Sequence, residues 1–228
     1  HGIDHDAGLD LVLHTPGGEI EATRAIVEYL RQIFDNNIRV VVPHLALSAG
    51  TMIACASDRI VLGKHSSLGP TDPQVRGFPA LGIIGEVDRA LNDIEDDPRK
   101  KFFWQCVFEK YPPGFITDCE RAKNVTQEIL RKWLTNGMLR GSEDPEDKVN
   151  SILSNLMHFE GTTSHGHHFM LKECQEFGLK VEVLENDQKL QENVLSVHHA
   201  FVASLLHYGH IKLVENHADQ SWSVEPDR

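Results

Sequence analysis

A serine and a pair of glycines stand at two turns where residues of these types could support nucleophilic catalysis. Ser48 follows an apolar β-type run, 38–43, and precedes a small, apolar segment, 49–56, that predicts a buried helix. At a helix N-terminus the unpaired N–H groups and the dipole favour negative charge. Such a turn can present a nucleophilic serine and stabilise its oxyanion. Taken alone, Ser48 fits the commoner role of an N-cap residue better.

The second turn lies upstream and contains Gly17 and Gly18, between a predicted strand at 9–13 and a predicted helix at 19–34. Two consecutive glycines allow the backbone to approach a ligand closely, although an ordinary strand-to-helix turn also uses glycine. We expect the N–H groups of Gly18 and Ala49 to bind an oxyanion, with Gly17 shaping the turn. The occurrence of both turns in series favours catalysis over chance.

These turns belong to a repeating pattern of strands and helices, which predicts an α/β fold with parallel strands. A third strand is expected at 58–62, a further strand at 179–184, and later helices at 116–134, 147–157 and 187–208. The glycine-rich, apolar segment 76–85 suggests either a mobile loop that lines a substrate site or a buried subunit contact. We expect one domain over 1–214, with a helical extension from about 115, and the polar segment 215–228 favours disorder.

Composition excludes several classes of protein. The net charge of −12 argues against a nucleic-acid partner. The sequence contains no run of 18 apolar residues, so it predicts no membrane-spanning helix. Four widely spaced cysteines are most simply free thiols in a reducing cytoplasm, with two disulfides as the alternative. The nearby histidines His165, His167 and His168 lack an acidic or cysteine partner at ligand spacing. We expect a loop and helix cap there, and no metal site in the chain.

Several longer blocks of the sequence resemble the serine dehydrogenase proteinase family, a relative of signal peptide peptidase A within the Clp protease/crotonase superfold. The blocks are 14–18, 48–54, 63–74 and 110–113, with shorter matches at 133–134, 163–165 and 178–181. The resemblance implies a fold of repeated ββα/βα units. It also implies a strand and helix preceding this chain, and a homo-oligomer, either a trimer or a hexamer.

The sequence does not decide which residue is the general base. Clp proteases place a histidine near the position of Thr71 and Asp72, where this sequence has none. His65, in the segment that the resemblance brings past Ser48, is one candidate because imidazole transfers protons near neutrality. Signal peptide peptidase A instead uses a lysine several tens of residues after its serine. Four lysines have that spacing, and Lys110 is favoured because its aromatic neighbours could bury its stem; the others are Lys100, Lys101 and Lys123.

The leading hypothesis is a serine peptidase that needs no ATP, metal or other cofactor. Its partner would be a polypeptide substrate, including membrane-protein segments, bound by strand addition as the superfold implies. The dehydrogenase activity in the family's name has no Gly-x-Gly-x-x-Gly turn to support it here. The alternatives are a crotonase-like acyl-CoA enzyme and a non-catalytic assembly module. We expect a cytoplasmic location, or membrane attachment through a segment that this chain does not include.

Overall fold

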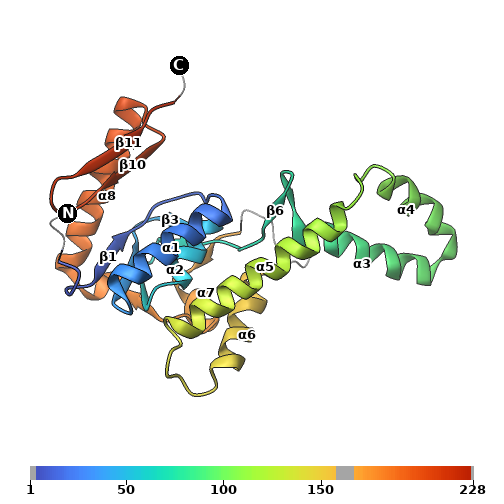
Figure 1. Cartoon of the computed structure of the whole chain (residues 1–228), viewed down its shortest axis with the longest axis horizontal. Helices are drawn as coiled ribbons and strands as arrows, with labels where there is room; N and C mark the ends of the chain where they lie inside the picture. The colour runs from blue at the N-terminus through green and yellow to red at the C-terminus, as the bar shows by residue number, and fades with distance from the viewer. Residues whose placement is uncertain (1–3, 158–166, 227–228) are drawn as a thin grey trace.

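The computed structural model describes residues 4–157 and 167–226, and its centre is a four-stranded parallel sheet (Figure 1). The strand order is β1-β2-β4-β9, and the first three strands pair in register, with Val40 opposite both Leu11 and Ile60. The bounds are β1 (Leu9–Val12), β2 (Ile38–Val42), β4 (Arg59–Leu62) and β9 (Val181–Val183). The predicted α/β fold with parallel strands is confirmed.

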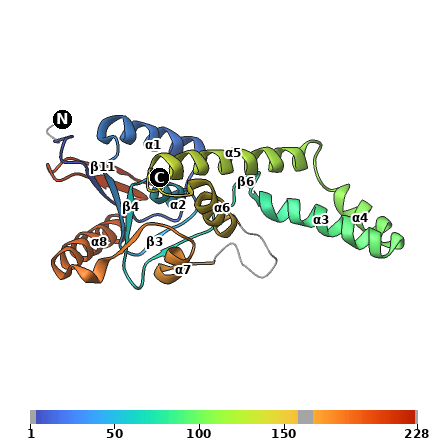
Figure 2. The same ribbon diagram turned by 90° about the horizontal axis from the view of Figure 1, so that it is seen from below.

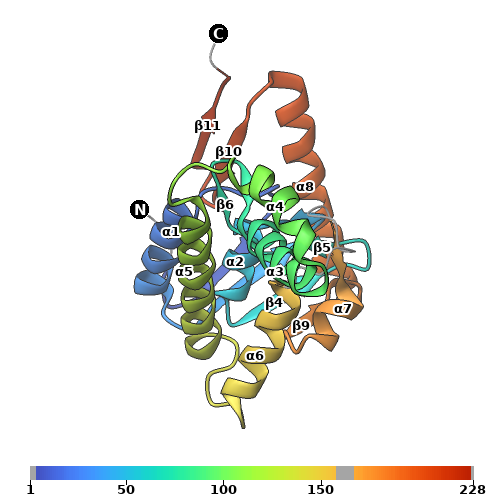
Figure 3. The same ribbon diagram turned by 90° about the vertical axis from the view of Figure 1, so that its right-hand side faces the viewer.

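Helices cover both faces of this sheet (Figures 2 and 3). One face carries α1 (Ile20–Phe34), α2 (Ala49–Cys55) and α5 (Phe115–Asn136), and the other carries α8 (Gln188–Tyr208). The alternation of β-strand side chains explains this arrangement, because neighbouring residues point to opposite faces. Val40 and Val42 join the larger core, whereas Val41 packs with Leu184 and Val194 on the α8 side.

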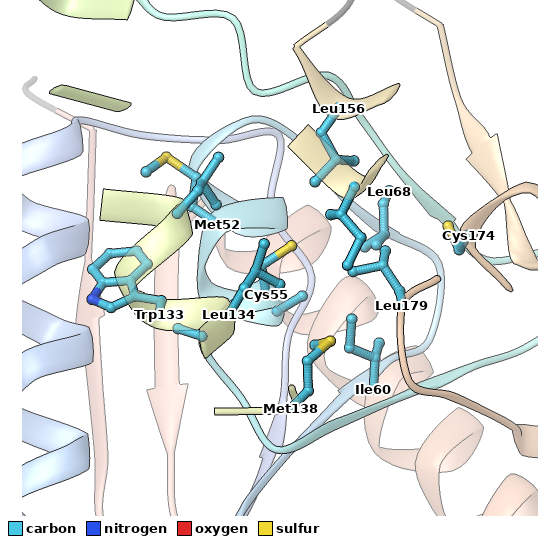
Figure 4. Close-up of a cluster of buried hydrophobic side chains, with 14 of the residues drawn as sticks. Met52, Cys55, Ile60, Leu68, Trp133, Leu134, Met138, Leu156, Cys174 and Leu179 are labelled. Atoms are coloured by element: carbon cyan, nitrogen blue, oxygen red, sulfur yellow. The ribbon is translucent and has the colours of Figure 1, made fainter. Parts of the chain in front are cut away.

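The larger core fixes α2 between the sheet and α5. Met52 and Cys55 of α2 lie close to Trp133 and Leu134 of α5, with Ile60 of β4 below them (Figure 4). All five side chains are buried. Burying a large apolar side chain contributes about 1.5–3 kcal/mol, so this packing holds the short helix α2 rigidly in place.

A second, smaller sheet extends from the turns that follow β1 and β2. Its order is β3-β5-β8, with β3 (Leu45–Ala46) parallel to β5 (Ser67–Leu68) and β8 (Phe169–Met170) antiparallel to β5. Thr15 forms an isolated parallel bridge with Ala46. Strand β3, which lies just before Ser48, is therefore paired with β5 along one edge and with Thr15 along the other.

The segment 76–85, for which the sequence suggested either a mobile loop or a buried subunit contact, forms the end of a hairpin and the start of a helix, so the mobile-loop prediction is wrong. The hairpin strands are β6 (Gln74–Val75) and β7 (Phe78–Pro79), and α3 (Ala80–Asp96) starts at once. Ala80 and Ile83 are buried against Phe115 and Cys119 of α5. This packing offsets the cost of glycine in a helix, about 1 kcal/mol per residue.

The helical extension consequently begins earlier than residue 115. Together α3, a 3-10 turn η1 (Pro98–Lys100), α4 (Lys101–Phe108) and the first half of α5 form an arm that projects from the sheet (Figures 1 and 2). The remaining helices lie beside the sheet: α6 (Pro145–Leu156), α7 (Leu171–Glu176) and the 3-10 turn η2 (Leu184–Asn186). Across the described ranges, no helix combines the length and apolarity needed to cross a bilayer.

The C-terminal segment also differs from expectation, because it contains a strand where polarity favoured disorder. An antiparallel hairpin joins β10 (Lys212–Glu215) to β11 (Ser221–Val224), with Val214 opposite Trp222. Its turn is closed by the Asn216 side chain, whose Oδ1 accepts the N–H groups of Ala218 and Gln220 at 3.0 and 3.1 Å. Local hydrogen bonding of this kind defines a turn that composition alone does not reveal.

Candidate active site

Ser48 occupies a strained turn between β3 and α2. Its φ of 51° and ψ of −111° are unusual for a residue with a side chain, and its carbonyl accepts the first helical N–H, from Met52, at 3.1 Å. A serine held on a sharp, strained strand-to-helix turn is the arrangement by which many hydrolases expose a nucleophile. The residue is half-buried, so a substrate can still reach it.

Backbone hydrogen bonds join this turn to the glycine turn. Thr15 donates its N–H to the carbonyl of Leu45 at 3.1 Å, and Leu47 donates its N–H to the carbonyl of Thr15 at 3.0 Å. Gly17 therefore lies directly beside Ser48: a Cβ on Gly17 would be 3.2 Å from the Ser48 Cβ and 3.7 Å from its Oγ. The φ of Gly17 is 128°, a conformation that side chains disfavour.

The N–H groups near Ser48 differ in their availability. That of Gly17 is occupied, because it donates to the Thr15 hydroxyl at 3.1 Å. Within the described ranges, the N–H groups of Gly18 and Ala49 donate to no other group. Gly18 is exposed, and a Cβ there would meet nothing within 4 Å. Two N–H donors near the serine are thus free of other acceptors in the chain, the one of Gly18 on an exposed residue and the one of Ala49 on a buried residue.

The buried side chain of Thr51, in α2, stabilises the Ser48 turn through hydrogen bonds to backbone groups. The Thr51 hydroxyl lies 2.8 Å from the carbonyl of Ala46 and 2.9 Å from that of Gly69, and it accepts the Gly69 N–H at 3.0 Å. Gly50 makes room for the neighbouring turn, since a Cβ there would come within 2.5 Å of the Thr15 methyl group. Small residues after Ser48 are therefore required by close packing.

Among the described contacts, His65 makes no hydrogen bond to the Ser48 hydroxyl. It is exposed; burial, and after it the charges of several histidines including His65, lower the pKa of His198 on α8. The backbone of its neighbour Lys64 donates to Glu185 at 2.8 Å. This end of the segment 63–74 consequently faces η2 and α8.

The other polar residues of 63–74 are engaged in structural contacts. The Ser66 hydroxyl is buried and accepts the N–H of Gly63 at 3.0 Å. Asp72 is also buried, and its Oδ1 accepts the N–H of Leu81 at 3.0 Å near the start of α3. Asp72 therefore helps to attach the arm to the sheet domain.

Of the three neighbouring histidines His165, His167 and His168, the structure describes two, and these two have separate hydrogen-bond partners. His165 lies outside the described residues. His168 shares a hydrogen bond with the Ser67 hydroxyl at 2.8 Å, whereas His167 pairs with Glu173 at 3.3 Å. The two described imidazoles thus have different partners, and within the described ranges neither belongs to a group of three potential metal ligands.

The candidate lysines occupy different environments. Lys100 pairs with Asp93 at 2.6 Å, and this hydrogen bond raises the pKa of the ammonium group. Lys101 and Lys110 are exposed on the arm, so the burial expected for the Lys110 stem is wrong. Lys123 is half-buried on α5, the helix that packs on α2. No described side chain is hydrogen-bonded to the Ser48 hydroxyl.

Three histidines that sequence reasoning missed, His14, His44 and His198, lie close together. The rings of His14 and His44 stack with centroids 5.4 Å apart, and His198 of α8 lies 4.9 Å from His14 and 6.2 Å from His44. Burial and then the charge of His44 lower the pKa of His14. His14 and His44 follow the adjacent strands β1 and β2, so the sequence could have indicated that these two lie close together. His198 comes from the distant helix α8, which the sequence does not place beside them.

Comparison with known proteins agrees with this geometry. The model of a family described as ClpP-like SDH-type serine proteinases matches residues 2–196. The chain belongs to this family of Clp-like α/β proteins, as the sequence blocks at the two turns predicted.

Two curated relatives are both from Methanocaldococcus jannaschii. The uncharacterized protein MJ0137 is 30% identical over 178 residues, covering 78% of this chain and 54% of its own length. The uncharacterized protein MJ1495 is 36% identical over 137 residues, covering 54% of this chain and 44% of its own length. The chain thus spans about half the length of the curated relatives that it matches.

Proposed function

We propose that this chain is a serine peptidase in which Ser48 is the nucleophile. The observation that carries the proposal is the contact between the strained Ser48 turn and Gly17, with two uncommitted N–H groups beside it. Membership of a serine proteinase family supports the same reaction class. No bound cofactor is required for this chemistry, because the nucleophile and the oxyanion donors all come from the chain.

The reaction would proceed through an acyl-enzyme. The Ser48 Oγ attacks the scissile carbonyl while a base takes the hydroxyl proton, and the carbonyl oxygen becomes an oxyanion held by the N–H groups of Gly18 and Ala49. The C–N bond then breaks as the amine receives that proton. Water, deprotonated by the same base, attacks the ester and releases the carboxylic acid and the serine hydroxyl.

For the base we propose a lysine or a histidine, and Lys123 joins Lys110 and His65 as a candidate because it is half-buried on α5. Lys110 and His65 are exposed. Replacement of each by alanine would distinguish them, since only the true base should lower the labelling rate of Ser48.

The substrate class that we propose is an extended polypeptide, including segments of membrane proteins. The open space above Gly18 leaves room for a substrate backbone. Homo-oligomerisation, as a trimer or hexamer, is part of the same proposal, and it is supported by two phenylalanines of the arm, Phe102 and Phe103, which are 74% and 63% exposed. Light scattering of the purified protein tests this assembly.

A direct assay separates the proposal from its alternatives. Wild type should cleave unfolded casein without ATP, and Ser48→Ala should abolish cleavage while retaining the fold and the oligomeric state. A crotonase-like enzyme would bind or convert an acyl-CoA thioester and tolerate that substitution. An assembly module would do neither, so the absence of both activities in correctly assembled protein would reject catalysis.

A further inference from the structure

Among the described residues, one group of side chains has the composition of a metal site and no part in the proposed peptidase chemistry. It consists of His14 after β1, His44 after β2 and His198 on α8. One ring nitrogen from each lies within 4.8 Å of the others. Within the described ranges, no hydrogen bond engages any of the three rings, so their nitrogens are available to a ligand.

The chemistry of the three side chains selects a class of ion. Neutral imidazole nitrogen is a ligand for zinc, copper, nickel and cobalt, whereas magnesium and calcium prefer oxygen. Three nitrogens around zinc, with bonds of about 2.0–2.1 Å, would be about 3.3 Å apart in tetrahedral geometry. His14 and His44 are exposed and His198 is half-buried, so modest rotation of the rings can close the remaining separation.

We propose that His14, His44 and His198 form a binding site for one divalent transition-metal ion, Zn²⁺ in the first instance, with a water molecule as fourth ligand. The ion joins two neighbouring strand ends to the helix on the same face of the sheet. His14 lies three residues before Gly17, and His44 four residues before Ser48. The ion therefore connects α8 to both turns of the candidate active site without entering the peptidase reaction.

The neighbouring histidines provide matched controls. His199 follows His198 on α8, and their ring centroids are 5.9 Å apart, but His199 is not part of the three-histidine group. His199→Ala removes the same chemical group one position away and leaves the proposed ligands intact. Ser48→Ala, in turn, should leave metal binding unchanged, so this site can be tested whether or not the chain is a peptidase.

The test is a titration of tag-free, EDTA-treated protein with ZnCl₂, followed by competition with a chromophoric chelator. Wild type, His199→Ala and Ser48→Ala should each bind one equivalent, and His44→Ala and His198→Ala should lose affinity by about tenfold or more, since even outer-shell partners of a metal site change it by that factor. Affinity that is unchanged in His44→Ala and His198→Ala would overturn the proposal, because the bound metal would then belong to other histidines.

A second measurement uses the wild-type chain alone and so does not depend on the folding of a variant. Diethyl pyrocarbonate modifies accessible imidazoles, and peptide mass spectrometry locates the adducts. Added Zn²⁺ should protect His14, His44 and His198 while His199 stays reactive. Equal modification of all four with and without Zn²⁺ would contradict the site.

Discussion

Gly17 lies against Ser48 so closely that a single methyl group on the glycine would approach the serine Cβ to 3.2 Å. This contact joins the two turns that sequence analysis identified separately. It results from two backbone hydrogen bonds, from Thr15 to Leu45 and from Leu47 to Thr15. Backbone pairing therefore brings the proposed nucleophile and the proposed oxyanion donors together.

The first prediction concerns Gly17→Ala. The φ of 128° and the close approach to Ser48 should cost about 1–3 kcal/mol of unfolding free energy and displace the serine. Thermal unfolding and the rate of Ser48 labelling by a fluorophosphonate measure the two effects. Gly18→Ala is the control, since its Cβ enters open space and its N–H is retained. Equal behaviour of the two variants would show that the contact is unimportant.

The second prediction is a coupling between Gly50 and Thr15. Gly50→Ala places a Cβ 2.5 Å from the Thr15 methyl group, and overpacking of this kind costs about 1–3 kcal/mol. Thr15→Ser removes that methyl group but keeps the hydroxyl that binds Gly17, so it should restore most of the loss. A double-mutant cycle in urea measures the coupling. Additive losses would mean that the clash is relieved elsewhere.

The third prediction uses two buried threonines of α2 and α5. Thr51→Val removes the hydroxyl that accepts the Gly69 N–H, and a buried donor left without a partner costs about 1–3 kcal/mol. Thr126 is equally buried, but its hydroxyl has no hydrogen-bond partner within the described ranges. Thr126→Val should therefore be neutral or stabilising. Equal destabilisation of both variants in urea unfolding would contradict this assignment.

The fourth prediction concerns the cysteines, all of which are free thiols. Burial raises the pKa of the Cys55 thiol, and burial together with the charge of Glu173 raises that of Cys174 to about 12. Because the thiolate is the reactive form, both should resist a disulfide reagent at pH 8, whereas the exposed Cys106 should react quickly. One fast thiol in native protein and four after denaturation is the expected count. Cys106→Ser should remove the fast phase, and a fast phase that persists would contradict the burial pattern.

Much of the sheet domain could be predicted from sequence, because its strands and helices carry clear apolar periodicity. The strand at Ile38–Val42 and the amphipathic helix at Ile20–Phe34 are examples. The two turns of the candidate active site were recognisable for a related reason: small residues recur where two backbones come close. Local pattern and tertiary packing agree in this part of the chain.

Other features depend on contacts between distant segments. The helix Ala80–Asp96 begins in a glycine-rich stretch and is stabilised by burial against Phe115 and Cys119, which sequence periodicity did not reveal. The candidate bases Lys110 and Lys123 both follow Ser48 by several tens of residues, and they differ in solvent exposure, which the sequence does not reveal. The histidine group was missed because His198 reaches the two strand ends from a helix more than 150 residues away.

The most direct test of the central claim is the intact mass of the protein after exposure to a fluorophosphonate. We predict a single adduct on wild type, located on Ser48 by peptide mapping and abolished by Ser48→Ala. An adduct that persists in Ser48→Ala would place the reactive group elsewhere. No adduct on a folded, fully assembled preparation would contradict an activated serine and thus the peptidase proposal.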